Sequence, residues 1–148
     1  NPAAQGYLQG VPMGGTLSSA PGVAPRLLLI AQRDPASAAI DEVQVIKGWQ
    51  TEDGVEEAVT TVFLAGDTNG ASVICQQWVD PDFDGTKPAF YYMRALETPT
   101  PRWTTFDCDA LAVDCAVPEL VPDAAKQCCE LPRNIRERAW TSPIWYQP

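Results

Sequence analysis

The segment AFYYMRALE, residues Ala89–Glu97, specifies the fold more clearly than any other part of this sequence. It is rich in aromatic and apolar residues and contains neither glycine nor proline, a composition that favours a β-strand. Side chains of a strand alternate between its two faces. One face therefore carries Phe90, Tyr92, Arg94 and Leu96, and the other carries Tyr91, Met93 and Ala95. Both faces are largely apolar, which predicts a strand in the middle of a sheet.

Further strands are predicted on both sides of this segment. An almost continuous apolar run predicts a central strand, covered on both faces, over Arg26–Arg33. Alternating or β-branched residues predict four more strands, at Glu42–Trp49, Ala58–Ala65, Ala71–Val79 and Arg138–Tyr146. We expect Pro143 to place the last of these at a sheet edge or a bulge, because proline has no N–H for the ladder.

The connecting segments are rich in turn residues, and no long amphipathic helix is evident. A hairpin loop is predicted at Gln50–Gly54 and a turn at Gly66–Gly70. The glycines and prolines of residues 1–25 predict an irregular segment that wraps the surface, with a short edge strand around Tyr7–Met13. We therefore predict an all-β fold in which residues 1–148 form a single antiparallel β-sandwich of the immunoglobulin or fibronectin type.

Composition argues against several classes of function. The chain has 148 residues, no histidine and a formal net charge of −9. Without histidine, these residues cannot form a Ser-His or Cys-His nucleophilic pair or a His-liganded metal site. The negative charge repels phosphate backbones, which argues against nucleic acid as a partner. The longest apolar run, Leu27–Ala31, is far shorter than the ~20 residues that span a bilayer, so we predict no membrane span.

Four cysteines cluster in residues 98–137, a segment that interrupts the succession of strands; they are Cys108, Cys115, Cys128 and Cys129. Because this Pro- and Asp-rich stretch buries little apolar surface by itself, we predict that two disulfides stabilise it as an insertion before the last strand. A bridge between the adjacent Cys128 and Cys129 would be strained, so each is expected to pair with Cys108 or Cys115. The sequence leaves both connectivities open. A four-thiolate zinc site is the disfavoured alternative, because the spacings lack C-x₂₋₄-C pairs.

Oxidised cysteines also predict an extracytoplasmic compartment, either periplasmic or secreted. Cys75 stands alone among alternating residues, and we expect it to be a small buried side chain rather than a reactive thiol. Within the insertion, a short helix is expected over Phe106–Val113.

Asp80, Asp82 and Asp84 alternate ahead of Gly85, in the manner of the opening of a calcium loop. These three carboxylates are therefore candidate calcium ligands. The match covers half of the ligand set, because the position of the bidentate acid is occupied by Tyr91 and no helices are expected to flank the loop. The alternative interpretation is a solvated turn between two strands.

The aromatic residues could furnish a stacking platform for a sugar ring; they are Trp49, Trp78, Trp103, Trp140 and Trp145, with Tyr91, Tyr92 and Tyr146. Of these, Trp103, Trp140 and Trp145 are the candidate aromatic binding surface. Such rings can stack on a sugar or contact another protein, although aromatic residues at strand positions are more often part of a core. No two acidic residues can be placed across a cleft from sequence, so an autonomous hydrolase is disfavoured and no catalytic residue is assigned.

Several strings of this sequence can be matched to a family. They are GVPMGG at 10–15, DEVQVIKGW at 41–49, WVDPDFD at 78–84, AFYYMRALETPTPRWTTFD at 89–107 and RERAWTSPIWY at 136–146. Together they resemble the C-terminal part of a bacterial family catalogued as domain of unknown function 3604. The strings keep their order and span almost the whole chain.

The resemblance implies a β-rich accessory domain of a larger secreted or envelope protein. The preceding part of such proteins is similar to metal-dependent hydrolases of the polymerase-and-histidinol-phosphatase type, whose metal ligands match no residue here. The leading hypothesis is a non-catalytic module that packs against that upstream domain. A strand supplied by the upstream part would leave a sheet edge here, open to that part or to a second copy of the chain. The alternative is a free-standing extracytoplasmic module that binds glycan or protein through exposed aromatic residues.

Overall fold

The computed structural model describes residues 2–18, 22–66 and 70–148. The chain divides into two compact units. The first comprises residues 1–97 together with 138–148, and the second comprises Thr98–Glu137, the segment predicted to be an insertion. Residues 67–69 of the predicted turn at Gly66–Gly70 lie outside the described residues.

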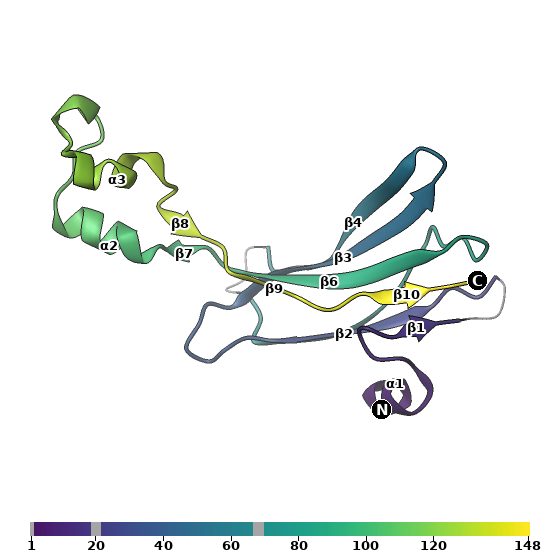
Figure 1. Cartoon of the computed structure of the whole chain (residues 1–148). Helices are drawn as coiled ribbons and strands as arrows, with labels where there is room; N and C mark the ends of the chain where they lie inside the picture. The colour runs from purple at the N-terminus through teal and green to yellow at the C-terminus, as the bar shows by residue number, and fades with distance from the viewer. Residues whose placement is uncertain (1, 19–21, 67–69) are drawn as a thin grey trace. The chain divides into compact units, whose positions relative to one another are not determined.

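The larger sheet of the first unit has six strands in the described part of the chain (Figure 1). The order is β1 (Thr16–Leu17), β10 (Ile144–Tyr146), β6 (Ala89–Glu97), β3 (Ile40–Thr51) and β4 (Gly54–Leu64), with β9 (Arg138–Trp140) also paired to β6. All of these pairs are antiparallel except β1 with β10. The AFYYMRALE segment is therefore the central strand that its sequence predicts, between β3 on one side and β9 and β10 on the other.

A smaller sheet pairs β2 (Arg26–Gln32) with β5 (Val73–Val79) in antiparallel register. One core cluster joins the two sheets; it contains Leu27 and Leu29 of β2, Val45 of β3, Ala89 and Tyr91 of β6, and Tyr146 of β10. A second cluster contains Ile40, Val43 and Ile74. The apolar faces of the two sheets thus remove each other from water, which is the main favourable contribution to folding.

The smaller sheet corrects two predictions. Strand β2 is not covered on both faces, since Ile30 is 48% exposed, and Cys75 is exposed rather than buried. Both errors have the same cause. The core shared with the larger sheet covers only one face of the smaller sheet. On β5 the inward positions are taken by Ile74 and Trp78 on either side of Gln76, which leaves Cys75 outside.

The N-terminal segment also differs from its prediction. Residues Pro2–Gln9 form the helix α1, where an irregular segment and an edge strand were expected. Its Ala3, Ala4, Gln5 and Leu8 are good helix formers, and proline is well suited to the first position of a helix. The glycines and prolines that argue against regular structure belong mostly to the residues after the helix, which ends where Gly10 N–H donates to the Gly6 carbonyl at 3.0 Å.

The last predicted strand is divided in two. Residues Arg138–Tyr146 form β9 and β10, with Pro143 between them, and both strands pair with β6. Strand β10 is not at an edge, because β1 lies on its other side. The proline is accommodated because its missing N–H falls between the two strands, while its carbonyl accepts a hydrogen bond from Gly14 N–H at 2.8 Å.

The second unit is small and mostly exposed. It contains the short strand pair β7 (Thr100–Pro101) and β8 (Asn134–Ile135), the helices α2 (Trp103–Ala110) and α3 (Gln127–Glu130), and the 3₁₀ turns η1 (Pro118–Leu120) and η2 (Asp123–Ala125). The helix expected over Phe106–Val113 thus begins three residues earlier, at Trp103, and ends at Ala110. No helix of the described residues is long and apolar enough to cross a membrane.

Disulfides hold this second unit together. Cys108 is bonded to Cys128 and Cys115 to Cys129, with Cα–Cα distances of 5.6 and 5.4 Å. This connectivity is one of the two that the sequence left open. Cys108 lies in α2 and Cys128 in α3, so this bond joins the two helices directly. The disulfides thus take the place of the apolar core that this polar segment is too small to form.

We predict that reduction unfolds the second unit and leaves the sheets of the first unit folded. Loss of a native disulfide costs about 2–5 kcal/mol, and the second unit buries few apolar side chains that could offset it. Iodoacetamide should modify Cys75 alone before reduction and all five cysteines afterwards. Limited proteolysis of the reduced protein should cut within residues 98–137; first cleavage within β3 or β6 would contradict this prediction.

Candidate functional site

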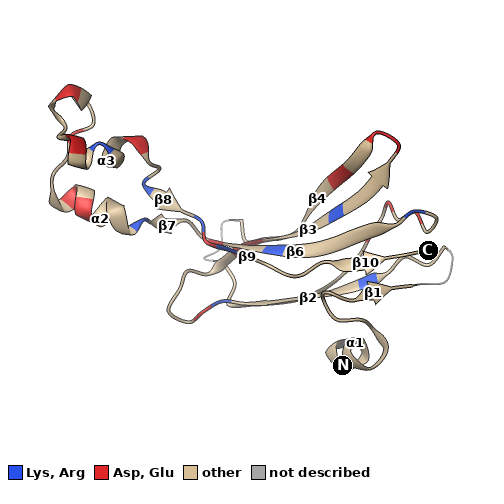
Figure 2. Ribbon diagram, viewed as in Figure 1, with Lys and Arg blue, Asp and Glu red and all other residues tan. Residues whose placement is uncertain are grey.

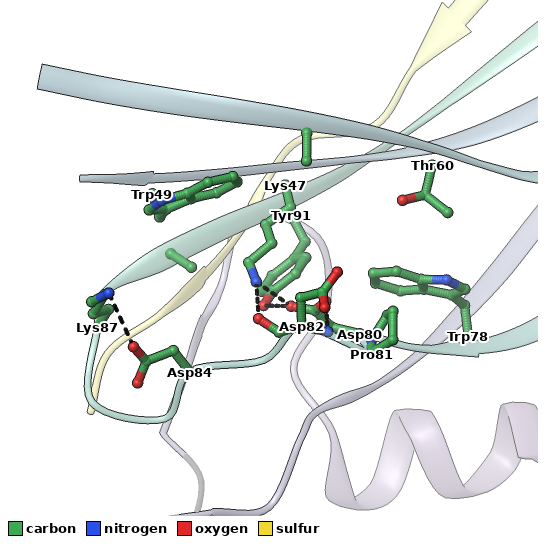
Figure 3. Close-up of a pocket in the computed structure, with 12 residues that line it drawn as sticks. Lys47, Trp49, Thr60, Trp78, Asp80, Pro81, Asp82, Asp84, Lys87 and Tyr91 are labelled. Carbon is green, nitrogen blue, oxygen red and sulfur yellow. Dashed lines mark hydrogen bonds and ion pairs between the residues drawn. The ribbon is translucent and has the colours of Figure 1, made fainter. Parts of the chain in front are cut away.

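A pocket of about 330 Å³ lies in the first unit, between the β3–β4 hairpin and the segment that follows β5 (Figure 3). Its volume is at the lower end of the roughly 300–1,000 Å³ that is usual for small-molecule sites. Strand alternation explains which residues of β3 face it. Lys47 and Trp49 lie opposite Tyr91 and Ala89 of β6 in the ladder, on the face that the core shares.

A buried ion pair forms the floor of this pocket. Lys47 Nζ lies 2.6 Å from Asp80 Oδ2, and the two side chains are only 13% and 4% exposed. Tyr91 donates its hydroxyl proton to Asp80 Oδ2 at 2.8 Å, and the Asp82 backbone N–H donates to Asp80 Oδ1 at 3.0 Å. Lys47 also donates to the Asp82 carbonyl at 2.7 Å. Removing charges from water is costly, and these hydrogen bonds offset the cost.

Tyr91 is held in its neutral form by this environment. Burial, and then its hydrogen bond to Asp80, raise the pKa of Tyr91 above its ordinary value. It therefore remains a hydrogen-bond donor to the carboxylate across the whole physiological range.

Two indole rings flank the ion pair. Trp49 comes from β3 of the larger sheet and Trp78 from β5 of the smaller one (Figure 3). The ammonium of Lys47 lies 5.4 Å from the centre of the Trp49 ring, and Trp78 contacts Tyr91 with ring centres 6.3 Å apart. The carboxylate of Asp82 is exposed at the pocket, and it has no hydrogen-bond or ion-pair partner among the described residues.

The aspartates whose spacing resembles a calcium loop make different interactions in the structure. Asp80 pairs with Lys47, whereas Asp84 accepts hydrogen bonds from the backbone N–H and hydroxyl of Thr86 at 3.0 and 2.7 Å and pairs with Lys87 at 3.2 Å. The Thr86 bonds above all, with Lys87, lower the pKa of Asp84 to about 2. Among the described residues no three His, Cys, Asp or Glu side chains are grouped so that they could hold a metal ion. Asp80, Asp82 and Asp84 lie between β5 and β6, and a calcium-binding role for them stays a prediction.

The opposite face of the larger sheet carries an aromatic row. Trp145 is paired with Phe90 in the ladder and contacts its ring at 5.5 Å, and Phe90 is stacked with Tyr92 at 6.4 Å. Trp140 lies further along the same face, opposite Arg94. Trp140 and Trp145 are 57% and 47% exposed. We call this surface the outer aromatic face.

Gly48 allows this row to lie flat on the sheet. A Cβ atom at this position would be only 2.1 Å from the Phe90 ring, so any side chain would displace the ring. The glycine of the KGW sequence therefore has a steric role in the outer aromatic face.

The structure brings together part of the predicted aromatic surface. Trp140 and Trp145 share the outer aromatic face, whereas Trp103 belongs to α2 of the second unit, where it is 74% exposed. The sequence offers Trp49 and Trp78 only as members of a larger set of aromatic residues, without placing them on one surface. The period of two in DEVQVIKGW indicates that Lys47 and Trp49 share a face, but nothing in the sequence places Trp78 across from them.

We predict that Tyr91→Phe lowers the free energy of unfolding by about 1.5–3 kcal/mol at pH 7, because it removes a hydrogen bond to a charged group. Because the pKa of Tyr91 is raised in the folded chain, its neutral hydroxyl contributes its full stabilisation below pH ~10, the pKa of tyrosine in the unfolded chain. This contribution is lost as the pH rises further. Urea denaturation from pH 7 to 11 should show a smaller alkaline loss in the variant. Tyr92→Phe is the matched control, and equal behaviour of the two variants would contradict the prediction.

Comparison with known proteins agrees with the resemblance found in the sequence. The model of the family described as "Protein of unknown function (DUF3604)" matches residues 1–69 and 64–148. No curated protein and no solved structure matches the chain significantly. Since the two matches together cover the whole chain, this protein belongs to the DUF3604 family.

Proposed function

We propose that this chain is a non-catalytic accessory module of a larger envelope protein and that it packs against another part of that protein. The observation that carries the proposal is the outer aromatic face, where Trp140 and Trp145 are about half exposed. Val59 of β4, opposite Ile46 in the ladder, extends the apolar surface and is 50% exposed. Large exposed aromatic residues gathered on one sheet face are typical of surfaces that another domain covers.

The expected architecture of such a module is an immunoglobulin- or fibronectin-like β-sandwich. Support comes from the core cluster that contains residues of both sheets, together with the mostly antiparallel ladders. The neighbour that we propose for it is an upstream domain of the metal-dependent hydrolase type. An extracytoplasmic location, periplasmic or secreted, is supported by the disulfides of the second unit.

Pairing between copies through a sheet edge is a weaker part of the proposal. Strand β4 forms an edge of the larger sheet and exposes Val55 and Leu64. The hairpin that contains it also carries acidic residues near its tip, as Figure 2 shows, among them Glu56 and Glu57. Like charges along an edge oppose edge-to-edge association, so the outer aromatic face is the better candidate for a contact.

Binding of a glycan or another protein to the outer aromatic face is the second candidate function. The specific observation in its favour is the succession of contacting rings Trp145, Phe90 and Tyr92 on one sheet face, because neighbouring aromatic rings can stack on sugar rings. A glycan and a neighbouring domain would compete for the same face, which makes the two functions separable by experiment.

Hydroxyl-radical footprinting tests the accessory role. We predict that Trp140 and Trp145 are oxidised several-fold more slowly in the full-length gene product than in the 148-residue chain, since a neighbouring domain would cover them. Trp103, which is also exposed but belongs to the second unit, is the control and should be oxidised at the same rate in both.

Three outcomes would contradict the accessory role. One is equal oxidation of Trp140 and Trp145 in both proteins. Another is a natural gene product that consists of the 148-residue chain alone. Protection of these tryptophans only after a soluble oligosaccharide is added would favour the second candidate function instead.

A further inference from the structure

We infer that the pocket between Trp49 and Trp78 is a binding site for a neutral sugar ring. This site lies on the inner face of the larger sheet, whereas the accessory role proposed above uses the outer aromatic face. The inference therefore does not depend on that proposal. It rests on the aromatic walls, the polar groups between them and the local charge.

The walls of the pocket suit the faces of a sugar ring. Two indoles, from different sheets, line one cavity of about 330 Å³ (Figure 3). Both are only partly buried and pack with their inner portions against the core, so part of each ring remains available to a ligand. Aromatic rings present a negative face that attracts the polarised C–H groups of a sugar.

The polar groups of the pocket provide a donor and an acceptor side by side. Lys47 has three N–H donors, of which two are directed to Asp80 and to the Asp82 carbonyl. The Asp82 carboxylate accepts no hydrogen bond from the described residues. A hydroxyl group both donates and accepts, so neighbouring hydroxyls of a sugar can accept from Lys47 and donate to Asp82 at the same time.

The charge of the pocket favours a neutral ligand over an ion. Two lysines and three aspartates line it, which leaves an excess of one negative charge. An anion would face Asp82 and Asp84 in a chain of net charge −9. A cation bound between the two indoles would be repelled by the Lys47 ammonium, which lies 5.4 Å from the centre of the Trp49 ring. A polyol satisfies the polar groups without either repulsion.

The floor of the pocket is rigid before any ligand arrives. The Asp80 carboxylate is 4% exposed and holds both Lys47 and Tyr91 in place. Groups that are already fixed lose little conformational entropy on binding. Polar groups held in place between two indole rings suit a sugar, whose hydroxyl groups bind weakly one by one.

Isothermal titration calorimetry of the intact chain with neutral gluco-, manno-, galacto- and xylo-oligosaccharides tests the inference. We expect saturable binding of at least one of them. The exposed Asp82→Ala should weaken binding by roughly tenfold through loss of a charged acceptor, and Trp78→Ala should weaken it at least as much. Asp53→Ala at the hairpin tip is the matched control and should bind within twofold of the wild type, ~0.4 kcal/mol. Trp145→Ala separately tests whether a sugar binds at the outer aromatic face instead.

The remaining outcomes each overturn the inference. Because Trp78 packs against the core, Trp78→Ala is compared with the wild type only if its thermal unfolding remains cooperative. If Trp78→Ala does not fold, the effect of Asp82→Ala on sugar binding decides by itself. Absence of binding by every neutral oligosaccharide at millimolar concentration contradicts a sugar site. Binding that is lost in Trp145→Ala but kept in Asp82→Ala would assign the sugar to the outer aromatic face. Binding of tetramethylammonium or oligogalacturonate in place of neutral sugars would show an ion site.

Discussion

The ion pair between Lys47 and Asp80 is the interaction on which the pocket of the first unit depends. Lys47 belongs to the larger sheet and Asp80 directly follows β5 of the smaller one, so the pair links the two sheets at the margin of their common core. Tyr91 completes the network from β6. A buried ion pair is not in itself strongly stabilising, because its desolvation is costly. Its value here is geometric, since it directs the turn after β5 and holds the walls of the pocket at a set separation.

The two faces of the larger sheet carry different aromatic residues for different physical reasons. On the inner face, Tyr91 is 2% exposed and packs between the sheets with its hydroxyl group satisfied by Asp80. On the outer face, Phe90 lies over Gly48 and beside Trp145, where part of the row remains exposed. Strand alternation separates these two sets although they are adjacent in sequence. The same strand therefore supplies both the core and the surface that we propose for contact with a neighbour.

The second unit obtains its stability in another way. It has few buried apolar side chains, and the bonds Cys108–Cys128 and Cys115–Cys129 constrain its unfolded state instead. The vicinal cysteines reach different partners because they follow one another in α3, whose side chains point in different directions at successive positions.

The sequence alone determined the properties that depend on local pattern. It was sufficient for the central position of Ala89–Glu97, most other strands, the two disulfides among Cys108, Cys115, Cys128 and Cys129, and the family to which the chain belongs. It failed where a contact distant in the chain decides the outcome. Cys75 is exposed because it points away from the core that the two sheets share. The error at α1, by contrast, has a local cause, since the glycines and prolines of residues 10–25 outweighed the helix formers of residues 3–8 in the overall count. The pocket is another case in which distant contacts decide the outcome. Lys47 and Trp49 come from β3, Trp78 and Asp82 come from residues 78–84, and only the tertiary structure brings these two segments to one cavity. Periodicity reports which face a side chain occupies, whereas the tertiary structure alone decides what lies opposite that face.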